Sequence, residues 1–153
     1  MDFADLVQPV LKKAVWAALL AAAPAFACGY HGGVAQERSL MNLAYPQALH
    51  VHTAVWQAQL GGRLERAELP YIKVAFLLNE LRPHLAANAS VVLLTPMLWT
   101  SYRPEGVRVH AEGPAEGDVV VVTEAVVVKA IVEGRLSMTD ALAGGMVRIY
   151  ASH

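Results

Sequence analysis

Residues 118–152, with the sequence DVVVVTEAVVVKAIVEGRLSMTDALAGGMVRIYAS, carry the most informative pattern in the chain. The run of valines predicts a strand over residues 118–122, because β-branched side chains favour extended backbone. Thr123 can cap a helix over residues 125–133, and Gly134 can end that helix. A strand that leads directly into a helix is therefore expected.

A second, shorter helix and a closing strand follow. Ser137, with Asp140 in the position that a capping box requires, precedes the apolar pair Ala141–Leu142. Gly144–Gly145 stops this helix, and residues 146–151 return as a strand. The last third of the chain thus predicts the order strand, helix, helix, strand.

Working towards the N-terminus, the preceding segment reads as short β-rich runs separated by turns rich in glycine and proline. The expected strands cover residues 91–95, 98–103 and 107–112. In the third run, Val107 and Val109 alternate with Arg108 and His110, which is typical of a strand with one wet face. The connections are too short for helical crossovers, so we expect mostly antiparallel pairing.

Helical spacing precedes these strands. Residues 46–60 place apolar side chains at three- and four-residue steps before Gly61, and residues 71–87 do the same after Pro70. Pro83 should kink or shorten the second helix. The sequence predicts an α+β fold, in which a mostly antiparallel sheet is covered by helices on one side.

The C-terminal punctuation resembles a known family. Its pattern is similar to the C-terminal part of sterol carrier protein 2 domains. The matching features are an acidic residue at a strand (Asp118), Gly-Arg-Leu at 134–136, Asp-Ala-Leu at 140–142 and a closing segment at 144–149. The resemblance covers about residues 90–151. It implies an apolar tunnel between sheet and helices that holds a lipid or acyl chain, and a carrier that binds without covalent chemistry.

Large or flexible apolar side chains near the sheet and its helical cover are the candidate lining of such a tunnel, with ordinary core packing as the alternative for each. The candidates are Phe76, Met97, Trp99, Tyr102, Val128, Ile131 and Met138. The remaining upstream part, residues 28–89, does not match the family's pattern.

The N-terminus predicts export. Lys12–Lys13 precede an apolar run over residues 14–23, and Ala25-Phe26-Ala27 fits the A-x-A site of a signal peptidase. The run is shorter than the roughly 20 residues that cross a bilayer. We therefore expect a signal peptide over residues 1–27, an arm over 28–45 and one domain over 46–153. A buried alanine-rich helix of a cytosolic protein is the alternative.

Cleavage after Ala27 would make Cys28, the only cysteine, the first residue of a periplasmic or extracellular protein without an internal disulfide. Lipidation of Cys28 is an alternative, and it would hold the domain at a membrane surface. Cys28 and His31 also suggest a copper or zinc site, since thiolate and imidazole suit these metals. His50 and His52 lie about 200° apart on the expected helix, so they cannot both face one ion.

Charge and motifs exclude several functions. The formal net charge is −1 and the sequence has no basic stripe, so no nucleic-acid partner is expected. Hydrolase and phosphate-loop motifs do not occur, so we expect no enzyme, and the sequence names no cofactor. An interaction subunit of an exported complex is a further alternative, with Trp56 on the 46–60 helix either anchoring a protein partner or closing the core.

Overall fold

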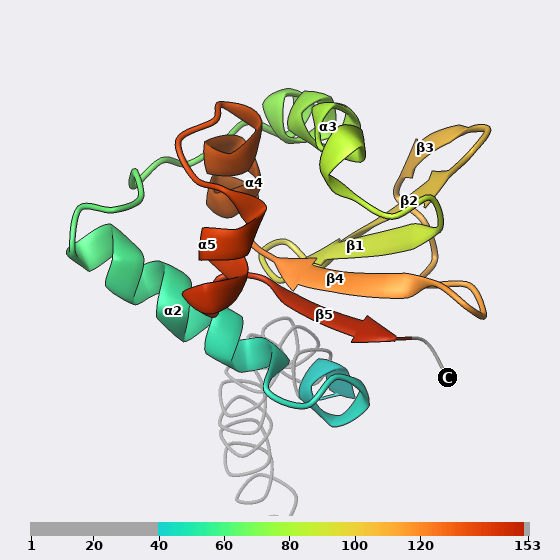
Figure 1. Cartoon of the computed structure of the whole chain (residues 1–153), viewed down its shortest axis with the longest axis horizontal. Coiled ribbons are helices and arrows are strands. Elements are labelled where there is room, and N and C mark those ends of the chain that lie inside the picture. Colours follow the sequence, from blue (N-terminus) through green and yellow to red (C-terminus); the bar gives the residue numbers. More distant parts are fainter. Residues whose placement is uncertain (1–39, 152–153) are drawn as a thin grey trace, which may run out of the picture. The chain divides into compact units, whose positions relative to one another are not determined.

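The short β-rich runs pair into one five-stranded sheet in the computed structural model, which describes residues 40–151 (Figure 1). The strands follow the spatial order β3-β2-β1-β4-β5. Their bounds are Ala89–Leu93 for β1, Leu98–Arg103 for β2, Gly106–Val109 for β3, Val119–Thr123 for β4 and Arg148–Ala151 for β5. The predicted α+β class is confirmed, with a sheet that is mixed and mostly antiparallel.

One pair of strands runs parallel, contrary to what the short connections suggested. β1 lies beside β4, with Ala89 opposite Val119 and Leu93 opposite Thr123, whereas the other three pairs are antiparallel. The β2–β3 hairpin occupies one edge, so residues 110–118 must return across the sheet to start β4 on the far side of β1. A non-helical connection is sufficient for this crossing.

Four α-helices and one 3₁₀ turn accompany the sheet within the described part of the chain. They are α2 (Ala48–Leu60), α3 (Tyr71–Glu80), η1 (Arg82–His84), α4 (Ala125–Val132) and α5 (Met138–Ala143), with a further helical segment at 40–44. The expected helix over 71–87 ends early because Pro83 cannot continue it. The expected start at residue 46 moves to Ala48, since Gln47 adopts a left-handed conformation with φ of 66°.

The residues predicted to begin and end α4 and α5 do so, except at the start of α4. Gly134 has φ of 69° and follows the end of α4. The Ser137 hydroxyl accepts a hydrogen bond from the Asp140 N–H at 3.0 Å, which caps α5. The N-cap of α4 is Glu124 instead of Thr123, and the Thr123 hydroxyl donates to the carbonyl of Met146.

The segments before and after α2 contact opposite faces of the sheet. Tyr102 projects from one face and donates its hydroxyl to the Leu78 carbonyl of α3 at 2.6 Å. Trp99 and Tyr150 belong to the other face by the strand register, and both rings contact Tyr45. Contrary to expectation, the sheet is therefore not covered on one side only, because the segment before α2 lies against the second face.

A buried carboxylate ties the strands to the loop before β4. Asp118 accepts hydrogen bonds from the Ser90 hydroxyl at 2.6 Å, the Arg103 guanidinium at 2.8 Å and the Ala115 N–H at 2.9 Å. Burial favours the neutral acid, but these donors outweigh it and hold the pKa of Asp118 below its ordinary value. Asp118 thus fixes the crossing segment where it enters the sheet.

The predicted signal peptide and most of the predicted arm lie outside the described residues. Within residues 40–151, no helix combines the length and the apolar character that crossing a bilayer would require. The chain from Met41 onward forms one compact unit.

Candidate functional site

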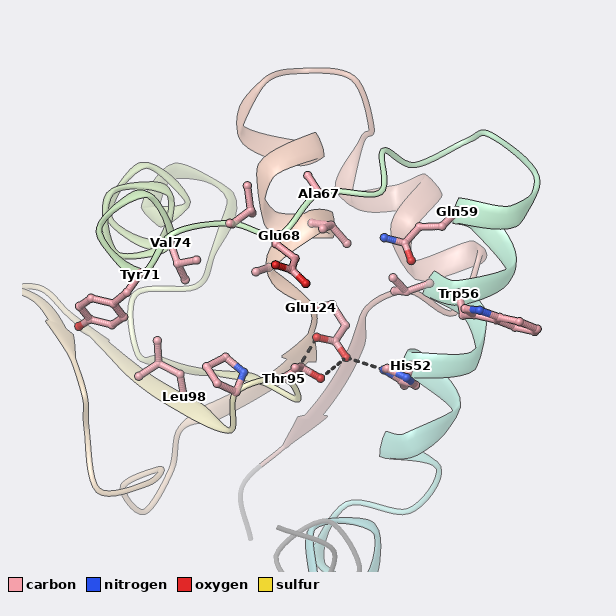
Figure 2. A pocket seen from close by; sticks show the side chains of 15 residues that line it. His52, Trp56, Gln59, Ala67, Glu68, Tyr71, Val74, Thr95, Leu98 and Glu124 are labelled. Atoms are coloured by element: carbon pink, nitrogen blue, oxygen red, sulfur yellow. Dashed lines mark hydrogen bonds and ion pairs between the residues drawn. The ribbon is translucent and has the colours of Figure 1, made fainter. Parts of the chain in front are cut away.

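A pocket of about 430 Å³ lies where four segments from distant parts of the sequence meet. Its wall comes from α2, from the segment that leads into α3, from the β1–β2 turn and from the start of α4 (Figure 2). The lining residues are His52, Val55, Trp56, Gln59, Ala67, Glu68, Leu69, Tyr71, Val74, Thr95, Pro96, Leu98, Glu124, Ala125 and Val126. Most of these side chains are apolar, and the polar side chains of His52 and Thr95 contact Glu124.

Glu124 is the buried polar centre of this wall. Its side chain is only 8% exposed, and it accepts a hydrogen bond from the Thr95 N–H at 3.2 Å and from His52 Nδ1 at 2.9 Å. The Thr95 hydroxyl contacts the same carboxylate at 3.4 Å. Because an ionised carboxylate can only accept, the contact with His52 assigns a proton to Nδ1. The side chain at the junction of β4 and α4 is therefore held in one orientation.

The position of Glu124 explains how its charge is tolerated. It is the N-cap of α4, where the unpaired N–H groups of a helix favour a negative charge. His52 supplies a second favourable contact from α2, although its own side chain is 61% exposed. A buried charge with these partners costs less than an isolated one. The pair also joins α2 to the end of β4 across the pocket wall.

Glu68 adds a second carboxylate to the wall. Figure 2 shows the carboxylate ends of Glu68 and Glu124 directed into the same part of the pocket, whereas the Trp56 ring points outward. Within residues 40–151, Glu68 has no ion-pair partner. No lysine or arginine occurs among the described lining residues. The wall thus combines apolar surface with an excess of negative charge.

A larger hollow of about 700 Å³ lies elsewhere, between the β2–β3 hairpin and residues 111–115. Its wall carries Arg103, Glu105, Arg108 and Glu112, so charged groups of both signs face it. Such a wall suits water better than an apolar ligand, because removing charged groups from water is costly. The pocket beside Glu124 is therefore the better candidate for an apolar ligand.

None of the seven residues proposed from the sequence lies in the wall of this pocket. Tyr102, Val128 and Ile131 belong to the buried core. Phe76 lies on the outer side of α3 and is 63% exposed. The remaining three are half-buried against the core, namely Met97, Trp99 and Met138. Large apolar side chains in this chain therefore mostly pack in or against the core, and other residues surround the open volume.

Trp56 does not close the core. It is 57% exposed on α2, while the buried side of that helix consists of Ala48, Val51, Val55 and Ala58. Of its two expected roles, closing the core is thus wrong. Its part in binding a protein partner stays a prediction.

The proposed metal ligands Cys28 and His31 lie outside the described residues. In the part of the chain that the structure covers, no three histidine, cysteine, aspartate or glutamate side chains gather closely enough to hold a metal ion. His50 and His52 lie on one helix as expected. His50 is exposed to solvent, whereas His52 contacts Glu124.

Comparisons with protein-family models, with curated proteins and with solved structures found no match. The sequence pattern did not indicate Glu124, Thr95 or Glu68 as site residues. A carboxylate at the junction of a buried strand and a helix is the sequence signal that points to Glu124, because such a residue is neither in the strand's apolar run nor in a solvated loop.

Proposed function

We propose that this protein is an exported, non-catalytic carrier that binds a small apolar molecule in the pocket between α2, α3 and α4. The observation that supports the proposal is the pocket itself: about 430 Å³, a mostly apolar wall and a few converging polar groups around Glu124. Ligand sites in proteins commonly have volumes of about 300–1,000 Å³ and the same division of wall chemistry.

The driving force in this proposal is removal of apolar ligand surface from water. Such burial contributes about 25 cal/mol per Å² before the cost of ordering the ligand is subtracted. Leu69, Val74, Leu98 and Val126 provide the complementary surface. The resemblance to sterol carrier protein 2 domains, with their apolar tunnel, favours the same function. Export and the N-terminal signal belong to the proposal as well.

The proposal is tested by filling the pocket. Val126 lines it at the start of α4, whereas Val132 is a half-buried valine at the other end of the same helix and outside the wall. We expect Val126→Trp to reduce binding of the fluorescent apolar dye phenylnaphthylamine at least tenfold, while Val132→Trp leaves it within about twofold. Equal binding by both variants would place the dye elsewhere and remove the support for this pocket.

A further inference from the structure

We infer that the pocket selects an apolar molecule whose polar end is a cation, such as a long-chain amine. The inference rests on the proposed function and adds the chemical class of the ligand. It depends on which charged groups surround the open volume and on how their hydrogen-bonding capacity is used.

The charges of the wall are unbalanced. Glu68 and Glu124 contribute two carboxylates, His52 contributes at most one positive charge, and no lysine or arginine lines the described pocket. The wall therefore stays negative whether or not His52 carries a second proton. Between apolar surfaces the effective dielectric constant falls below that of water, so this excess acts on a bound group more strongly than it would in solution.

The two carboxylates differ in how many hydrogen bonds they already accept. Glu124 already accepts from Thr95 and His52, and its side chain is nine-tenths buried. Glu68 is exposed and has no ion-pair partner within residues 40–151. Figure 2 shows its carboxylate pointing towards Glu124. A carboxylate can only accept hydrogen bonds. The group that complements this end of the pocket must therefore donate, and a positive charge improves each contact.

The same chemistry disfavours other amphiphiles. A fatty acid would bring a third carboxylate to described lining residues that include no lysine or arginine, and like charges at short range repel. An alcohol would be tolerated, since its hydroxyl donates one hydrogen bond, but it gains no charge-assisted contact. An ammonium group carries three donors and can contact Glu68 and the unused acceptor positions of Glu124 together.

Three ligands with one identical chain test the inference: octylamine, octanol and octanoate, titrated separately into the purified protein at pH 7 by calorimetry. We expect octylamine to bind about tenfold more tightly than octanol, and octanoate to bind more weakly than octanol. Added salt should weaken octylamine binding and leave octanol binding unchanged, because screening acts on the charged ligand only.

A matched pair of variants assigns the effect to the pocket. Glu68→Gln should lower the affinity for octylamine about tenfold and leave that for octanol within twofold. Glu80→Gln, an exposed carboxylate on α3 outside the wall, should change neither.

The outcomes separate the two proposals. Octanol and octanoate binding as well as octylamine, in a manner that Val126→Trp abolishes, would overturn the cationic ligand and leave the carrier intact. Failure of all three ligands and of phenylnaphthylamine to bind would overturn the carrier, and the inference with it.

Discussion

The Asp118 network gives a quantitative test of the fold. Asp118→Asn keeps the shape of the side chain and removes its charge, while Ser90, Arg103 and the Ala115 N–H remain as donors. The asparagine oxygen can keep one or two of these contacts, but Arg103, with a side chain 24% exposed, loses its ion-pair partner. Breaking a largely buried pair by removing one charge costs about 3 kcal/mol. We expect the free energy of unfolding at pH 7 to fall by that amount.

The cost should depend on pH in a defined direction. Because the donors hold the pKa of Asp118 below its ordinary value of 3.8, the folded state binds a proton less readily than the unfolded state. The stabilisation is therefore fully present above about pH 4 and is lost as the pH falls through the folded-state pKa. Urea unfolding followed by tryptophan fluorescence at pH 7 and at about pH 3 measures both values, and the difference between wild type and variant should shrink at the lower pH.

The control is Asp140→Asn, an aspartate that is exposed on α5. It should cost less than about 1 kcal/mol, as expected for an exposed charge near a helix N-terminus. A penalty for Asp118→Asn below about 0.5 kcal/mol, or one that is equal at both pH values, would refute the role assigned to this network.

Four further predictions concern the fold and the N-terminus. Tyr102→Phe should cost about 1–3 kcal/mol of unfolding free energy, because it leaves the buried Leu78 carbonyl without its donor, and an unchanged urea midpoint would contradict this. Burial raises the pKa of Tyr102, so wild type should also lose stability above about pH 10, where the unfolded tyrosine ionises first, and Tyr102→Phe should lose less over that range. Gly134→Ala should lower stability by about 1 kcal/mol, since φ is 69° there, whereas Gly61→Ala, at φ of −78°, should not, and thermal unfolding distinguishes the two. The denatured mass of protein from an exporting host should correspond to cleavage after Ala27, and an intact Met1 would contradict the signal peptide.

The local elements could be predicted because their signals are local. Pro83 shortens the second helix and Gly134 ends α4 through their own backbone preferences, and Ser137 caps α5 through its side-chain hydroxyl. The strand runs were located to within a few residues for the same reason. The parallel β1–β4 pair was missed, since it depends on a crossing segment whose path no local pattern specifies.

The pocket could not be predicted, because it is made by contacts between segments far apart in the sequence. His52 and Glu124 are 72 residues apart and meet only when α2 lies against the end of β4. Size and hydrophobicity selected Tyr102, Val128 and Ile131, and these are the properties that make a side chain fill a core completely. A ligand site instead needs open volume, and small or polar residues such as Ala67 and Thr95 provide it.

The most direct test of the carrier is the mass of the protein purified from an exporting host, recorded under native conditions for wild type, Val126→Trp and Val132→Trp. We expect a small-molecule increment on wild type and Val132→Trp that disappears on denaturation, and none on Val126→Trp. A bare wild-type mass, or an increment that Val126→Trp retains, would contradict binding in the pocket beside Glu124.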